Sequence, residues 1–336
     1  MAELPADAYQ LVAILHPNLV QGHGPFQVRA WFADCLRAGL VIVPPDQGWQ
    51  AALIAADLVI GDHGSVTTYG AALGKPVLLA EFPDKEVAPG TAVHRLGVLA
   101  PRLQLMAPLR RQVEDVLGRH EPARYRDVAE LVSSVPGETA QRLRELFYNL
   151  LDRTEPAGEA MTHAFPGDAL AASPRPQLSA ARVVCDVDVA GRVIRLERFP
   201  AELPPQLGAV PPRGQTHVAV HHAHPGWHLQ RAAEVVFAYD DEIDDPKGWR
   251  VQMLRDRPHC TVAATLGERD CVLRHRRRGR LNIAADARVD PATLASAALA
   301  WLDNAQPGTA EEPVSITVDI GECRTEMSIT WSGDRV

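Results

Sequence analysis

The chain has 336 residues, of which 46% are hydrophobic and 23% charged, and this composition is that of a globular protein long enough for two domains. The formal net charge of −8 offers no footprint for nucleic acid or for an anionic membrane surface, so we expect neither partner. The five cysteines are odd in number and form no C-x-x-C pair, which predicts reduced thiols and a cytoplasmic location rather than a disulfide framework.

The chain begins with MAELPADAYQ, which has neither the basic region nor the apolar region of a signal peptide, so we expect no leader. No later stretch reaches the roughly 18 consecutive apolar residues of a membrane span, so we expect no transmembrane segment.

The first part of the chain alternates short apolar runs with helical patterns, as far as a mainly helical stretch that begins near residue 107. Purely apolar strands that alternate with helices are typical of a parallel sheet covered on both faces. We therefore predict a doubly wound, Rossmann-like α/β domain over residues 1–153. Its strands are expected at 9–15, 40–44, 57–61 and 76–81.

Residues 154–178 are rich in proline, alanine and glycine and are predicted to form a linker. The sequence pattern changes after the linker, and residues 179–336 are predicted to form a smaller α+β domain of unassigned role. The pattern places one hairpin at 181–199 and a closing hairpin at 315–331. It also predicts a helix over 290–304, with Asp290 as its cap and a proline in its first turn.

Two loops of the first domain carry residues suited to an anion. The first runs from His16 to Gly24 and follows the first predicted strand; the second runs from Gly61 to Ser65 and leads into a helix. Both would lie beyond the carboxyl ends of parallel strands, where open α/β sheets bind ligands. Free N–H groups and the helix dipole favour an anion at the second loop. The alternative is that Asp62 or Ser65 merely caps the helix and that the first loop is a polar turn.

The sequence HPN at 16–18, followed by ADLVIGDHGSVTTYGAALGKPVLL at 56–79, resembles the C-terminal nucleotide-binding domain of GT-B-type enzymes. The closest patterns are those of the CDP-glycerol glycerophosphotransferases and the UDP-N-acetylglucosamine 2-epimerases, and the resemblance covers roughly residues 9–150. It implies that His16, Gly64 and Ser65 hold the diphosphate of a donor. The candidate binding residues are His16, Asn18, Asp62, His63, Gly64, Ser65 and Thr67, and the catalytic candidates are His16, His23 and His63.

The resemblance implies a transferase that binds a CDP- or UDP-linked sugar or polyol and needs no cofactor. This chain departs from the family in two ways: no carboxylate follows the loop before Glu81, and no second Rossmann-like domain follows the first. We therefore expect a chain that is incomplete as an enzyme alone, with a second protein or a missing N-terminal domain completing the cleft. The alternative hypothesis is a non-catalytic nucleotide-binding or protein-interaction module.

The second half contributes two further motifs. The segment HVAVHHAHPGWH, residues 217–228, holds five histidines that could ligate a metal, but no carboxylate or cysteine stands beside them in a recognised spacing. We therefore predict a surface strand with solvated imidazoles and no metal site. The run RHRRRGR, residues 274–280, could bind phosphate or nucleic acid, yet no aromatic residue interleaves it, and a solvated hairpin tip is the preferred interpretation.

Overall fold

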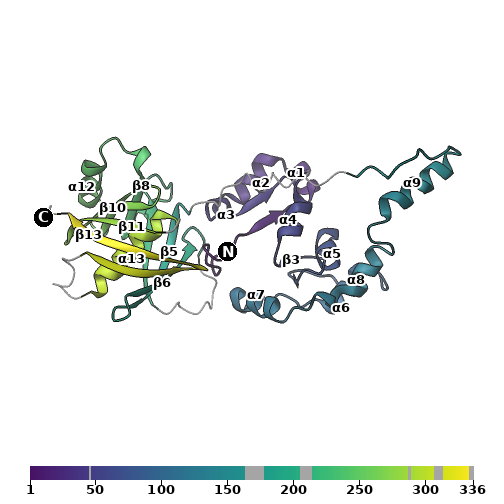
Figure 1. Ribbon diagram of the computed structural model, residues 1–336, viewed down its shortest axis with the longest axis horizontal. Helices are drawn as coiled ribbons and strands as arrows, with labels where there is room; N and C mark the ends of the chain where they lie inside the picture. The colour runs from purple at the N-terminus through teal and green to yellow at the C-terminus, as the bar shows by residue number, and fades with distance from the viewer. Residues whose placement is uncertain (45–46, 163–177, 205–213, 287–288, 306–312, 333–336) are drawn as a thin grey trace. The chain divides into compact units, whose positions relative to one another are not determined.

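The computed structural model describes the whole chain apart from residues 45–46, 163–177, 205–213, 287–288, 306–312 and 333–336. The chain divides into two compact units, which Figure 1 draws along one colour ramp. One unit comprises residues 1–13, 18–42 and 175–336, and the other comprises residues 14–17 and 43–174. The predicted linker lies largely outside the described residues, and its described parts, 154–162 and residue 178, form neither helix nor strand.

The described residues of the first half of the chain form four strands, each only three residues long. Strand β1 (Val12–Ile14) pairs with β2 (Val41–Val43), and β3 (Val59–Gly61) runs parallel to β4 (Val77–Leu79). The helices of this half are α1 (Pro17–His23), α2 (Pro25–Trp31), α3 (Ala33–Arg37), α4 (Trp49–Ala55), α5 (Ser65–Ala72), α6 (Ala92–Leu99), α7 (Leu109–Gly118), α8 (Arg126–Val132) and α9 (Thr139–Leu150), with a 3-10 turn at Pro122–Tyr125.

The predicted Rossmann-like doubly wound sheet, and with it the GT-B-type fold, is wrong. Strands occur within all four predicted apolar runs, but they pair as two separate two-stranded sheets among the described residues. The dominant sheet is instead a closed barrel in the second half. The physical reason is that an apolar run indicates that a strand is buried but does not indicate which strand pairs with it. Three-residue ladders are also shorter than the usual strand of about five or six residues.

The core of the first half is small. It consists of residues from β4, α5, α6 and α8, together with Tyr125, which is 1% exposed. By contrast, α9 turns several large apolar side chains to solvent, among them Phe147 (55% exposed) and Leu150 (73% exposed). The β3–β4 ladder therefore packs in one compact cluster, and the apolar side chains of α9 stay exposed in this chain.

Nine strands of the second half close into a mixed barrel, in the order β10-β11-β13-β12-β6-β5-β7-β8-β9. The β7–β8, β8–β9 and β12–β6 pairs are parallel, and the other pairs are antiparallel. The strands are β5 (Ala180–Asp188), β6 (Val193–Pro200), β7 (Gln215–His221), β8 (Val235–Tyr239), β9 (Val262–Leu266), β10 (Asp270–His275), β11 (Gly279–Ala285), β12 (Val314–Ile320) and β13 (Cys323–Ser332).

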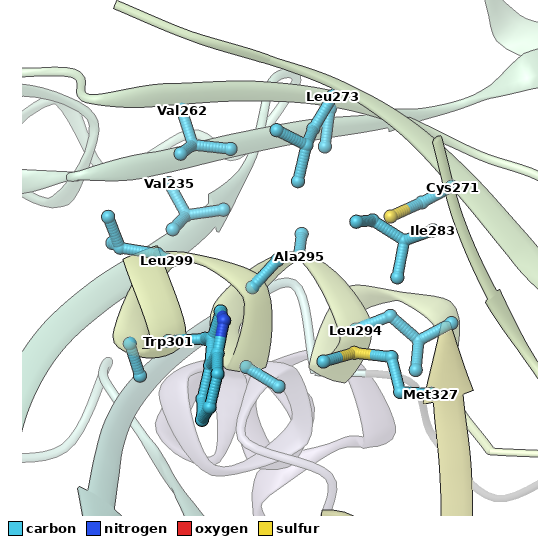
Figure 2. Close-up of a cluster of buried hydrophobic side chains, with 14 of the residues drawn as sticks. Val235, Val262, Cys271, Leu273, Ile283, Leu294, Ala295, Leu299, Trp301 and Met327 are labelled. Atoms are coloured by element: carbon cyan, nitrogen blue, oxygen red, sulfur yellow. The ribbon is translucent and has the colours of Figure 1, made fainter. Parts of the chain in front are cut away.

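Helix α13 (Pro291–Asn304) packs against the inner faces of the strands, and every residue from Pro291 to Leu302 is buried. Figure 2 shows Leu294, Ala295 and Leu299 of this helix facing side chains of the surrounding strands. A helix that is apolar on all sides is stable only when it is enclosed. The predicted helix start is confirmed, because the Asp290 side chain accepts a hydrogen bond from the amide of Ala292.

A buried ion group fixes the start of α13 to the barrel wall. Arg198 of β6 is 6% exposed and pairs with both Asp7 and Asp290. Its Nε lies 3.0 Å and its Nη2 2.6 Å from the two carboxylate oxygens of Asp7. The same guanidinium therefore joins the N-terminal segment, strand β6 and the cap of α13.

Two helices cover the outside of the parallel strands. Helices α11 (Trp227–Ala232) and α12 (Pro246–Asp256) contribute Leu229 and Leu254 to a second buried cluster, together with outward-facing residues of β7, β8 and β9. A short 3-10 turn at Asp240–Glu242 follows β8 and precedes α12. This part of the barrel therefore has apolar packing on both faces of its wall.

Candidate functional site

The loop from Gly61 to Ser65 leaves β3 and enters α5. Gly64 occupies the N-cap position, and no described side chain caps the helix. The Asp62 carboxylate instead accepts a hydrogen bond from the Gly64 amide at 2.8 Å, so it closes the loop on itself. An uncapped first turn leaves backbone N–H groups that an anion can accept from.

The side chains of this loop differ in accessibility. Asp62, His63 and Ser65 are exposed, and the His63 ring stands edge-on to Phe82 with the ring centroids 6.4 Å apart. Thr67 is 4% exposed, and its side chain lies where a β-carbon on Gly61 would be. Thr67 therefore packs the helix against the end of β3, while Asp62, His63 and Ser65 remain accessible to solvent.

The remaining predicted residues lie at the first loop. His16 lies between β1 and α1 and belongs to the same compact unit as the Gly61–Ser65 loop. Asn18 and His23 lie within α1 and belong to the unit of the barrel. The His23 ring contacts Trp31, with centroids 4.9 Å apart. A shared binding site for the two loops stays a prediction.

A different cluster forms at the carboxyl ends of the parallel strands β7 and β8. His221 Nε2 lies 2.7 Å and His222 Nε2 lies 3.5 Å from the same carboxylate oxygen of Glu242. One ligand atom from each of the three side chains lies within 4.8 Å of the others. The carboxyl end of a parallel strand pair is where α/β sheets place functional groups.

The end of β7 explains how two consecutive histidines meet one carboxylate. Successive residues of a strand point to opposite faces. His221 is the last residue of β7, and His222 already lies in the following turn, where its amide donates to the Phe237 carbonyl at 2.8 Å. The change of direction places the two rings on one side, with centroids 4.8 Å apart.

Neighbouring groups hold this cluster in place. The Glu242 carboxylate also accepts from the Tyr239 amide at 2.9 Å. The His221 ring packs on Phe237, with centroids 5.5 Å apart, and the His222 ring meets the edge of Trp249 at 5.7 Å. The three side chains therefore have limited freedom to separate.

The surroundings of His222 and Glu242 shift their pKa values toward the protonation states that metal ligands require. Burial and the neighbouring His221 lower the pKa of His222. Burial acts to raise the pKa of Glu242, but hydrogen bonds from the Tyr239 amide and from His221 outweigh it and lower that pKa. Metal ligation requires a neutral imidazole and an ionised carboxylate, and both shifts favour those forms. The side chain of Glu242 is 36% exposed, so solvent reaches the cluster.

The other histidines of the segment have different surroundings. His224 is buried, and its ring nitrogens lie 3.2 Å from a Glu202 carboxylate oxygen and 3.0 Å from the Gly226 amide nitrogen. His228 is exposed, and His217 is buried inside the barrel wall. The prediction of a strand with solvated imidazoles is therefore wrong for most of the segment. The carboxylate that pairs with His221 and His222, Glu242, lies in the acidic run YDDEIDD at residues 239–245, outside the histidine-rich segment.

The opposite ends of strands β7 to β9 border a cavity of about 220 Å³. His217 faces it with a buried Nε2 that has no hydrogen-bond partner in the described part of the chain, and burial lowers its pKa to about 4. Glu234 and Asp303 also line this cavity, and burial raises the pKa of each. A neutral imidazole and two carboxyl groups therefore share this end of the barrel.

No protein-family model, no curated protein and no solved structure matches this chain. The expected membership in the GT-B-type transferases is thus overturned by the barrel and has no relative to support it. Among the described residues, no helix is both long and apolar enough to cross a membrane.

Proposed function

We propose that the barrel binds a divalent transition-metal ion through His221, His222 and Glu242 and acts as a metal-dependent domain. The observation that carries this proposal is the convergence of two imidazole nitrogens and a carboxylate oxygen within 4.8 Å. Imidazole and carboxylate are the ligands that zinc, iron and related ions take in proteins.

The spacing of the three atoms supports a shared ion. A tetrahedral ion with bonds of about 2.1 Å separates its ligand atoms by roughly 3.4 Å. The two histidine–carboxylate separations are 2.7 and 3.5 Å, so an ion could replace both hydrogen bonds after small side-chain movements. Three protein ligands leave at least one position for water or an oxygen-bearing ligand, which is typical of catalytic rather than structural sites.

Titration calorimetry with Zn²⁺, and visible absorption with Co²⁺, test this proposal on the full chain. We expect one ion per chain and tetrahedral or five-coordinate Co²⁺ bands. Glu242→Gln and His222→Ala should each weaken binding by at least tenfold to a hundredfold, the loss that even outer partners of a metal site produce. His228→Ala, an exposed histidine of the same segment, is the matched control. Equal losses in all three variants, or no binding by the unaltered chain, would overturn the proposal.

We propose, as a second candidate function, that the Gly61–Ser65 loop binds the diphosphate of a nucleotide-activated sugar or polyol. The favouring observation is the uncapped α5 N-terminus with a glycine at its cap. A transferase activity would then need a second protein or a further domain to supply the acceptor side. The alternative within this candidate is a non-catalytic nucleotide-binding or protein-interaction module.

Calorimetry with CDP and UDP tests the second candidate. Ser65→Ala and His16→Ala should each weaken binding tenfold to a hundredfold, because a hydrogen bond to a charged phosphate contributes about 1.5–3 kcal/mol. Thr91→Ala serves as the control, since the Thr91 hydroxyl caps α6 and not α5. Absence of binding at millimolar nucleotide would reject this candidate and leave the metal proposal unaffected.

The cytoplasmic location predicted from the sequence also stays a proposal. Its support is that all five cysteines are free thiols, and three of them, Cys185, Cys260 and Cys271, are buried. Free thiols are typical of reducing compartments. Cell fractionation with a C-terminal tag is the direct test.

A further inference from the structure

The basic run 274–280 forms the end of β10, a turn and the start of β11. Two of its arginines donate hydrogen bonds to carbonyl groups at the C-terminal ends of helices. Arg276 donates to the carbonyl oxygens of Leu254 at 2.5 Å and Arg257 at 2.8 Å, at the C-terminus of α12, and Arg278 donates to that of Leu302 at 2.9 Å. Cations stabilise helix C-termini in this way. The predicted hairpin tip is observed, with Arg276 and Arg277 exposed, but Arg276 and Arg278 are also tied to helix ends by these hydrogen bonds.

The other two strand arginines of the run face each other. Arg274 of β10 and Arg280 of β11 are direct cross-strand partners. Their neighbours Leu273 and Leu281 are fully buried in the barrel, so both arginines point to its outer face. Like charges directly opposite in an antiparallel pair are destabilising unless something compensates them.

A third arginine reaches the same outer face from α12. Arg250 is 5% exposed and donates to the Thr265 hydroxyl of β9. Thr265 is paired with Val272, two residues from Arg274 and on the same face of β10. Burial and the charges of Arg280 and Arg274 lower the pKa of Arg250, which the carboxylates of Asp240 and Asp245 only partly offset. The guanidinium groups of Arg274 and Arg280 therefore repel that of Arg250.

We call Arg250, Arg274 and Arg280 the arginine cluster. No ion pair or hydrogen bond to a carboxylate involves these three side chains in the described part of the chain. The nearby Asp245 carboxylate is used as the N-cap of α12, where it accepts from the Gly248 amide at 3.0 Å. A buried guanidinium with a single hydroxyl acceptor is costly unless an anion accompanies it.

One buried group of the cluster and one beside it lack a hydrogen-bond partner among the described residues: the Arg280 Nε and the Ser332 Oγ. Arg280 and Ser332 are direct cross-strand partners between β11 and β13, and both belong to the outward-facing set of their strands. A buried donor left unpaired loses its hydration without compensation, so both groups are expected to meet an acceptor in the functional state.

We propose that Arg250, Arg274 and Arg280, together with the Ser332 hydroxyl, bind the phosphate group of a small-molecule ligand on the outer face of the barrel. Guanidinium groups match phosphate oxygens with paired hydrogen bonds, and a phosphate dianion neutralises most of the clustered charge. A small ligand is favoured over nucleic acid, because the chain carries a formal charge of −8 and no aromatic residue interleaves the run.

The site is independent of the metal proposal, although α12 contributes to both places. Trp249 contacts the ring of His222, and the next residue, Arg250, belongs to the arginine cluster. The two sites can therefore be tested one at a time, with the phosphate titration carried out in the presence of a metal chelator.

The probes are inorganic phosphate and pyrophosphate, titrated into the full chain by calorimetry. We expect saturable binding, and a tenfold to hundredfold loss of affinity in Arg280→Gln and in Arg274→Gln, as for hydrogen bonds to charged groups. Arg277→Gln is the control, because Arg277 is an exposed arginine of the same turn. Arg250 is left unchanged because its burial makes a folding defect the expected result.

Thermal unfolding supplies a second readout that a purely structural role would not produce. In phosphate-free buffer, Arg280→Gln should unfold at the same or a higher temperature than the unaltered chain, because it removes like-charge repulsion. Pyrophosphate should then raise the midpoint of the unaltered chain only. Lack of binding at about 10 mM phosphate or pyrophosphate, several decades weaker than micromolar recognition, would overturn the proposal. An equal loss of phosphate affinity in Arg277→Gln would also overturn it. So would tighter binding of a single-stranded oligonucleotide, if that binding depended on the same arginines.

Discussion

The two halves of this chain use apolar sequence in different ways. In the barrel, long ladders close on themselves and surround α13, so the alternate residues of each strand have an interior to face. In the first half, three-residue strands form two small sheets, and one compact cluster packs on the β3–β4 sheet. Among the described residues, the exposed large apolar side chains lie almost entirely before residue 162, with Val189 and Trp227 as the exceptions.

This difference shows that apolar content alone does not make a core. A strand stabilises a protein through its neighbours, and closure gives every barrel strand two of them. Helix α9 has an apolar stripe of the kind that normally packs inward, yet Leu146 is 49% and Phe147 is 55% exposed. The comparison predicts that substitutions of similar chemistry cost much more in the barrel than in the first half.

The largest effect is expected at the buried ion group of the barrel. Arg198→Ala leaves the Asp7 and Asp290 carboxylates without their cation and should lower the free energy of unfolding by about 3–5 kcal/mol. Denaturant unfolding followed by circular dichroism measures the loss. Arg195→Ala, whose guanidinium on the same strand is 62% exposed, is the control and should change little. A loss below about 1 kcal/mol, the value of an exposed pair, would break the comparison.

The apolar contrast itself is tested by a matched pair of leucines. Leu294 of α13 is fully buried, and Leu294→Ala should cost about 2–5 kcal/mol because it removes packed methyl groups and leaves a cavity. Leu146→Ala on α9 removes the same atoms from a side chain that is 49% exposed, and it should change stability by less than about 0.5 kcal/mol. Regional amide hydrogen exchange separates the two halves. Similar costs at both positions would show that α9 is covered in solution.

Acid should act on the barrel through His217. Its pKa is lowered to about 4 by burial, so the folded chain stays unprotonated at this group while the unfolded chain binds a proton below its ordinary value of 6.5. The stability that the neutral His217 contributes to the folded state is fully present above pH 6.5 and is lost as the pH falls toward 4. The total contribution to the free energy of unfolding is about 3 kcal/mol. Unfolding free energies measured at pH 7 and 4.5 should differ less in His217→Phe than in the unaltered chain. An unchanged difference would mean that His217 is accessible to protons in the folded state.

The smallest effect compares one helix cap in each half. The Thr91 hydroxyl accepts from the His94 amide at 3.1 Å at the start of α6, and Asp290 accepts from the Ala292 amide at 3.0 Å at the start of α13. Thr91→Ala should cost about 1 kcal/mol, the usual value of a lost cap. Asp290→Ala should cost more, since Asp290 also pairs with Arg198. Hydrogen exchange of the two helices measures both losses, and a larger effect at Thr91 would reverse the expected ranking.

Local features of the fold were readable from the sequence. The cap and proline at Asp290–Pro291 located the start of α13, and the alternating segments located the β5–β6 and β12–β13 hairpins. The apolar runs near residues 12, 41, 59 and 77 each contain a strand. These features depend on neighbouring residues only, such as a side chain that accepts from an amide two residues on or a turn between adjacent strands.

Only the tertiary structure decided which distant segments meet. The same strand patterns are compatible with an open parallel sheet or with a closed barrel, and an all-apolar helix does not state what encloses it. The parallel pairing of β7 with β8 brings Glu242 beside His221, and three separate elements bring Arg250, Arg274 and Arg280 to one face. Residues close in the sequence determined the elements of this protein. Their pairing depended on long-range contacts, whose free energy arises only once the chain has closed on itself.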